Sequence, residues 1–125
     1  MSKKILIADD DAQVVSALSR ALANYDLEEA GDGKTALSLA FSAHPDLIIL
    51  DIDMPAMNGI EVLEKLAKMK DRPLTIMLTG SGDPETVSKA MALGVFAYII
   101  KPFEMEEIQE QVKRAFSFME SKKAA

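Results

Sequence analysis

Residues 45–59 read PDLIILDIDMPAMNG, and this stretch decides the fold class. Its apolar run, Leu47–Leu50, is short and contains only leucine and isoleucine, which is typical of a strand buried on both faces. Two aspartates, Asp51 and Asp53, come after the run, and the pair Asn58-Gly59 then marks a loop. Because a strand that is apolar on both faces needs cover above and below the sheet, we expect an α/β fold.

The rest of the chain alternates between short apolar runs and segments with helical spacing of apolar residues. We expect strands at residues 5–8, 25–30, 47–50, 74–78 and 97–100, and helices at 12–24, 35–43, 60–70, 84–93 and 105–119. The second strand is the most polar, which favours a place near the sheet edge. This alternation predicts a five-stranded parallel sheet with right-handed crossovers and helices on both faces.

Length and composition limit the classes of protein that fit. The 125 residues predict a single domain over residues 1–125, with a core at about 4–119 and a frayed tail at 120–125. No apolar run approaches the length that spans a bilayer, and there is no cysteine for disulfides. The net charge of −6 argues against direct nucleic-acid binding. These features favour a cytoplasmic protein without membrane partners.

Polar side chains follow four of the expected strands at the point where each strand ends. They are Asp9, Asp10 and Asp11 after the first, Asp51 and Asp53 after the third, Thr79 and Ser81 after the fourth, and Lys101 after the fifth. Ligands of open parallel sheets bind at this edge. Clustered carboxylates suit a hard cation, either Mg²⁺ or Mn²⁺, and a lysine with a hydroxyl beside it suits a phosphoryl group.

Two other aspartates have structural interpretations. Asp11 stands where the N-cap of the first helix is expected, and we favour this role over metal binding. Asp32, in the sequence GDGK, is interpreted as an ordinary turn residue.

Four motifs resemble those of response-regulator receiver domains, the CheY-like family of two-component systems. They are KILIADDD, PDLIILDIDMPAMNGIEVL, IMLTGSGD and AYIIKPF, and they stand in the order and spacing of that family. The resemblance covers nearly the whole chain. It implies a doubly wound, flavodoxin-like (βα)5 fold with strand order 2-1-3-4-5.

The resemblance also implies a role for each matching residue. Asp51 would accept the phosphoryl group, while Asp9, Asp10, Asp51 and the backbone carbonyl of Asp53 would hold Mg²⁺. Thr79 would be the switch hydroxyl, Lys101 would pair with the phosphoryl group, and the Lys101–Pro102 peptide bond would be cis. Tyr98 would be the aromatic side chain whose rotation reports phosphorylation.

A receiver takes its phosphoryl group from a histidine kinase or a phosphotransfer protein and passes the signal to a protein target or an output domain. The resemblance places that readout on the face formed by residues 84–93, 97–100 and 105–119, through which a homodimer could also form. Enzymatic activity would be limited to Mg²⁺-dependent self-phosphorylation and self-dephosphorylation. Asp53 and Ser81 occupy variable positions beside the site, and we expect them to tune the lifetime of the phosphoryl-aspartate.

Two other interpretations stay open at this point. LIILDIDM resembles the DxD motif of haloacid-dehalogenase-like phosphohydrolases, in which Asp51 would be the nucleophile and Asp53 the acid/base. The expected acidic pair precedes this motif instead of following it, which argues against that class. The chain could also be a receiver-like interaction module that is never phosphorylated.

Overall fold

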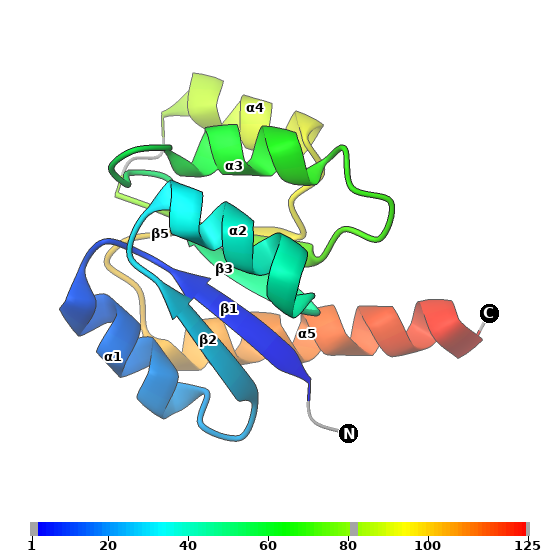
Figure 1. Ribbon diagram of the computed structural model, residues 1–125. Helices are drawn as coiled ribbons and strands as arrows, with labels where there is room; N and C mark the ends of the chain where they lie inside the picture. Colours follow the sequence, from blue (N-terminus) through cyan, green and yellow to red (C-terminus); the bar gives the residue numbers. More distant parts are fainter. Residues whose placement is uncertain (1–2, 81–82, 125) are drawn as a thin grey trace.

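The computed structural model describes residues 3–80 and 83–124, and in them one five-stranded sheet has the order β2-β1-β3-β4-β5 (Figure 1). Every neighbouring pair of strands is parallel. The strands are β1 (Lys4–Ala8), β2 (Asp26–Ala30), β3 (Leu47–Asp51), β4 (Leu74–Thr79) and β5 (Ala97–Ile100). The helices are α1 (Ala12–Ala21), α2 (Gly33–Ala43), α3 (Gly59–Leu66), α4 (Pro84–Ala92) and α5 (Met105–Ala124). The predicted fold class and strand order are confirmed.

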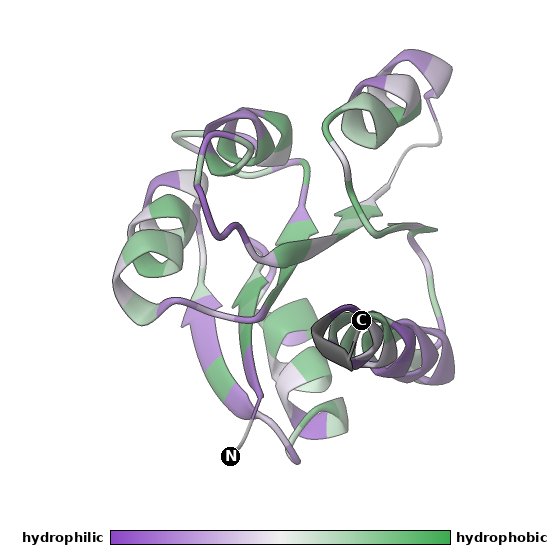
Figure 2. Ribbon diagram, turned by 90° about the vertical axis from the view of Figure 1, so that its right-hand side faces the viewer, coloured by the Kyte–Doolittle hydropathy of each residue, from purple (hydrophilic) through white to green (hydrophobic). Residues whose placement is uncertain are grey.

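The sheet separates two hydrophobic clusters. On one face of the sheet, strand residues such as Leu6 and Ile48 pack with α2, α3 and α4. On the other face, strand residues such as Ile7 and Ile49 pack with α1 and α5. All five residues of β3 are buried, because helices cover both of its faces. Figure 2 shows the hydrophobic colour concentrated on the inner strands and on the helix surfaces turned toward them.

The helix ends follow from local side-chain chemistry. Asp11 is the N-cap of α1 and accepts a hydrogen bond from the Gln13 backbone N–H, as predicted. The interpretation of Asp32 as an ordinary turn residue is wrong, because its carboxylate caps α2 through the backbone N–H and hydroxyl of Thr35. Gly94, with a φ of +87°, follows the C-terminal end of α4.

Four helices differ from their predicted bounds by two residues or more, and one of them, α2, begins at Gly33 instead of residue 35. Helices α1 and α3 stop at Ala21 and Leu66, before the expected residues 24 and 70, because tight turns replace their last helical turns. Met69 still packs against the core from such a turn. Helix α5 extends to Ala124, past the expected helix end at residue 119, and fraying of the tail at 120–125 stays a prediction. No helix in residues 3–80 and 83–124 has the length and apolar character needed to cross a membrane.

Candidate functional site

The ends of four strands meet at the carboxyl edge of the sheet. Asp51 is the last residue of β3, Thr79 is the last residue of β4, and Asp9 follows β1. Only 1% of Asp9, 2% of Asp51 and 2% of Thr79 is exposed to solvent. Alternate residues of a strand point to the same face, so the Asp51 carboxylate lies on the same face of β3 as Leu47 and Ile49, which is the α1 and α5 side of the sheet.

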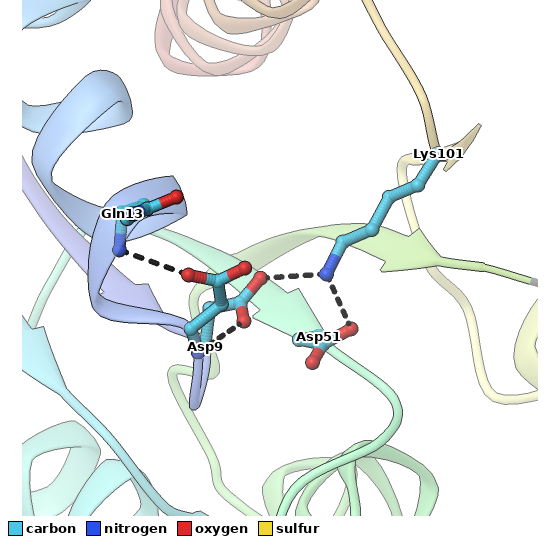
Figure 3. A network of polar contacts seen from close by, with 5 residues as sticks. Asp9, Gln13, Asp51 and Lys101 are labelled. Atoms are coloured by element: carbon cyan, nitrogen blue, oxygen red, sulfur yellow. Dashed lines mark hydrogen bonds and ion pairs between the residues drawn. The ribbon is translucent and has the colours of Figure 1, made fainter.

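The Lys101 side chain lies between two of these carboxylates (Figure 3). Its Nζ donates hydrogen bonds to Asp9 Oδ2 at 2.9 Å and to Asp51 Oδ1 at 3.2 Å. The backbone N–H of Asp11 donates to Asp9 Oδ1 at 2.9 Å, so both oxygens of the Asp9 carboxylate are held. Residues from three distant parts of the chain are therefore fixed within one hydrogen-bonded group.

The electrostatic balance of this group is unfavourable for negative charge on Asp51. Burial, and then the charge of Asp9, raise the pKa of Asp51 from 3.8 to about 6, although the Lys101 ammonium partly opposes this. For Lys101, burial lowers the pKa, but the hydrogen bond to Asp9 and the charge of Asp51 outweigh burial and raise that pKa above 10.5. Asp51 is thus a carboxylate whose charge is costly without more positive charge nearby.

The donor set fits a divalent cation. Carboxylate oxygens of Asp9, Asp10 and Asp51 lie within 4.8 Å of one another, and Asp10 is exposed while the other two are buried. These three carboxylates and one ammonium leave an excess of negative charge. Hard oxygen donors at this spacing are the ligands that Mg²⁺ and Mn²⁺ prefer.

The loop after β3 is held close to Asp51 by packing that the sequence did not reveal. Asn58 caps α3 in a reciprocal capping box with Glu61. A Cβ on Gly59 would collide with the Asp51 carbonyl oxygen, so only glycine allows α3 to start this close to the strand. Ala56 adopts a positive φ of 69°. In the sequence, the pair Asn58-Gly59 indicates a loop, but it does not indicate the contact between Gly59 and the Asp51 carbonyl.

The start of α2 also packs closely against the loop after β3. A Cβ on Gly33, the first residue of α2, would collide with the carbonyl group of Met57. The Gly33 N–H also points to the Pro55 carbonyl at 3.5 Å. The start of α2 and the loop after β3 are therefore packed backbone against backbone.

The remaining predicted site residues have different surroundings. The Asp53 side chain is exposed, and its backbone carbonyl stays a predicted ligand. Tyr98 is half-buried and packs against the cluster under α2, α3 and α4. The Lys101–Pro102 peptide bond is cis. Ser81 lies outside the described residues, so its predicted role stays a prediction.

Two open hollows reach the site from either side of the start of α1. The first has a volume of about 660 Å³ and is lined by Asp9, Asp10 and residues of α1 and β2. The second, of about 480 Å³, is lined by Asp11, Lys101 and the residues that follow Lys101. A partner can therefore approach the acidic cluster through Asp9 and Asp10, which line the first hollow, and the Lys101 side chain through the second.

Comparison with known proteins agrees with this geometry. The family model of the response regulator receiver domain matches residues 5–113. Regulatory protein AtoC of Escherichia coli (strain K12) is 38% identical over 122 residues, which are 96% of this chain and 26% of AtoC. The alkaline phosphatase synthesis transcriptional regulatory protein PhoP of Bacillus subtilis (strain 168) is 37% identical over 90% of this chain and 48% of PhoP. The chain thus spans about a quarter to about half of these relatives.

Solved structures match over nearly their full lengths. A CheY-like response regulator receiver domain protein from Methanospirillum hungatei JF-1 has a TM-score of 0.93 and 30% identity, covering 98% of this chain and 99% of that chain. Chemotaxis response regulator CheY4 of Vibrio cholerae has a TM-score of 0.85 and 31% identity, covering 92% and 99%. Family model, relatives and fold agree, and the chain belongs to the response regulator receiver domains of two-component systems.

Proposed function

We propose that this receiver domain accepts a phosphoryl group on Asp51 from a phosphohistidine of a cognate histidine kinase or phosphotransfer protein. One observation carries the proposal. A buried carboxylate at the end of β3 lies 3.2 Å from the Lys101 ammonium and beside two further carboxylates, at an edge that two hollows leave open. A nucleophile, a fixed positive charge and a cation-binding donor set are the parts that phosphoryl transfer to a carboxylate needs.

Receiver domains bind Mg²⁺ in an acidic site, and the residues present here fit that ion. Asp9, Asp10 and Asp51 would hold it together with the backbone carbonyl of Asp53, and Mn²⁺ would fit the same oxygen donors. When bound, the cation supplies positive charge next to the phosphoryl oxygens. Because the pKa of Asp51 is raised to about 6, that charge would also favour the ionised, nucleophilic form of Asp51.

The transfer step uses residues that the fold already places. A carboxylate oxygen of Asp51 forms the new bond to phosphorus, while the phosphorus–nitrogen bond of the donor breaks and its electron pair returns to the imidazole nitrogen. The Lys101 ammonium, already within 3.2 Å of Asp51, would neutralise a phosphoryl oxygen. Later hydrolysis, with water attacking phosphorus, would return Asp51 to a carboxylate, and no other enzymatic activity is proposed.

The proposed output starts at Thr79. Its hydroxyl, at the end of β4, would bond the phosphoryl group, and the loop toward α4 would follow. Tyr98, which packs on the same side of the sheet, would respond on the face of α4, β5 and α5. That face carries exposed apolar side chains, and we propose it as the docking surface for a target protein, an output domain or a second copy. The exposed apolar side chains are Met91, Ile100 and Phe118.

The relatives suggest the setting of this activity. AtoC and PhoP are regulatory proteins by name and are longer than this chain, so an output domain in the same polypeptide or a separate partner would read the signal. With a net charge of −6, this domain itself is not proposed to bind nucleic acid. The absence of cysteine fits action in the cytoplasm.

Intact-mass measurement after incubation with acetyl phosphate tests the proposal. Wild type should gain one phosphoryl group only when Mg²⁺ is present, and Asp51→Asn should gain none. Asp26→Asn, which alters an exposed carboxylate at the opposite end of the sheet, is the matched control and should behave as wild type. If neither acetyl phosphate nor beryllofluoride with Mg²⁺ changes the wild-type protein, the unphosphorylated interaction module becomes the better interpretation.

Asp53→Asn separates the receiver from the phosphohydrolase interpretation. A receiver should still form the phosphoryl-aspartate in this variant, because the proposed contribution of Asp53 comes from its backbone. A phosphohydrolase that uses Asp53 as acid/base would lose turnover of a generic phosphate ester. The family match already favours the first result.

A further inference from the structure

Helix α4 is held to the domain by few side chains. Ala90 is the one buried residue of α4, whereas α3 buries Gly59, Ile60, Val62, Leu63 and Leu66. The ion pair from Lys89 to Glu64 of α3 spans 3.7 Å, and its side chains are 56% and 46% exposed. Such exposed pairs hold a helix weakly. Helix α4 also lies at the outer end of the layer that it forms with α2 and α3 (Figure 1).

Arg72 makes a contact of a different kind at the C-terminal end of α4. Its Nη1 donates a hydrogen bond of 2.8 Å to the carbonyl oxygen of Leu93, the C-cap residue. The last carbonyls of a helix lack partners within the helix and carry its negative dipole end, so a guanidinium is well matched to them. This bond is also exposed to solvent, which weakens it, but a charged donor still makes a stronger bond than a neutral one.

Gly94 makes room for this contact. A Cβ at this position would collide with the Arg72 guanidinium, which shows that the charged group lies against the Gly94 backbone. The φ of +87° independently favours glycine. The Arg72 side chain therefore lies along the turn after α4, although Arg72 precedes this turn by 21 residues or more.

The two ends of α4 have different relations to the site. Arg72 lies just before β4 (Leu74–Thr79), at the end of that strand far from Asp51. The other end of α4 begins at its N-cap, Asp83, only a few residues after Thr79. One end of α4 is thus tied to the base of β4, and the other follows shortly after Thr79, the last residue of β4 at the carboxyl edge of the sheet.

We propose that Arg72 is a positioning residue that anchors the C-terminal end of α4, so that α4 responds to the site by moving at its N-terminal end about this anchor. The second half of this inference rests on the proposed function. The first half, the anchor itself, is independent of phosphorylation, because every contact that carries it lies at the far end of α4.

Amide hydrogen exchange of the full chain tests the anchor without any ligand. In Arg72→Ala, the amides of Leu93, Gly94 and Val95, which bond to carbonyls of α4, should exchange about five- to tenfold faster than in wild type. Lys70→Ala removes an exposed cation from the same connection and should leave their rates unchanged. Equal rates in the two variants would overturn the anchor, and unchanged protection of β1 and β3 will show that Arg72→Ala is folded.

The same measurement with Mg²⁺ and beryllofluoride tests the movement. In wild type, exchange should change in the N-terminal turns of α4 and stay constant at Leu93 and Gly94, whereas in Arg72→Ala the change should extend to both ends. A wild-type change of equal size at both ends would refute the pivot. If beryllofluoride alters no amide in wild type, including those around Asp51, the proposed function fails, and the comparison without ligand still decides on the anchor.

Discussion

Replacing Asp51 by asparagine should make the protein more stable at neutral pH, although it removes the proposed phosphoryl acceptor. The pKa of Asp51 is 3.8 in the unfolded chain and about 6 in the fold. This difference of about 2 units corresponds to about 3 kcal/mol of folding free energy, at 1.36 kcal/mol per unit. The substitution does not leave Lys101 unpaired, because its bond of 2.9 Å to Asp9 remains.

The sign of the pH dependence follows from proton binding. Between pH 3.8 and about 6 the folded wild type holds a proton on Asp51 that the unfolded chain has released, so the contribution of Asp51 to wild-type stability falls as the pH rises through this window. Asparagine carries no such proton. The stability difference, variant minus wild type, should therefore be close to zero near pH 4 and reach about 2–3 kcal/mol at pH 7, or about 10 °C in Tm.

Urea denaturation of both proteins from pH 4 to pH 7 measures this difference. Asp26→Asn removes the same unit of charge from an exposed position and should shift stability by less than about 0.5 kcal/mol. Adding Mg²⁺ should stabilise wild type more than the variant and narrow the gap, because the variant lacks one carboxylate of the proposed cation site. A variant that is no more stable than wild type at pH 7, or a gap that does not change with pH, would refute this account of the site.

Three further predictions concern residues around the site. Gly59→Ala should lower the free energy of unfolding by about 1–3 kcal/mol, measured by urea denaturation, because the new Cβ meets the carbonyl of the proposed phosphoryl acceptor; Gly31→Ala, where a Cβ meets nothing within 4 Å, is its control. Asp32→Ala should lower Tm at pH 7. That deficit should shrink as the pH falls through the folded-state pKa of Asp32, which two hydrogen bonds from Thr35 hold below 3.8. Asp53→Asn and Ser81→Ala should each change the rate of dephosphorylation, followed by loss of the phosphoryl mass with time, and rates equal to wild type would remove them as tuning residues.

The sequence predicted the sheet and the meeting of charged groups because both depend on simple regularities. Apolar runs such as Leu47–Leu50 form buried strands, and the carboxyl ends of parallel strands share one edge. Asp9, Asp51 and Lys101 therefore had to come close once the strands were placed, and the structure joins all three through the Lys101 ammonium. The resemblance to receiver domains supplied the order of the strands, which periodicity alone does not determine.

What the sequence did not reveal depends on contacts between distant segments. The sequence GDG has the composition of a turn and does not indicate that α2 starts at Gly33, after the Asp32 cap, or that Gly33 packs against the Met57 backbone. The positive φ of Ala56 could not be predicted, because an alanine does not indicate a left-handed backbone conformation. Helix α5 was expected to stop with its last inward-facing residue, Met119, yet no glycine or proline follows there, and helix formers carry it on to Ala124.

The division of the core into two clusters has a consequence for how this domain can vary. A strand backbone separates the two sets of packed side chains, so a cavity or an enlarged side chain on one face is not relieved by rearrangement on the other, and substitutions on opposite faces should be additive. Asp51 lies on the α1 and α5 side, and Thr79 continues the opposite face, with Met77. Mutations on the side of α2, α3 and α4 that spare Thr79 and Tyr98 can therefore change the surface over α4 with little disturbance of the side that carries the carboxylates. The chemistry of the site can then be kept while the binding partners diverge.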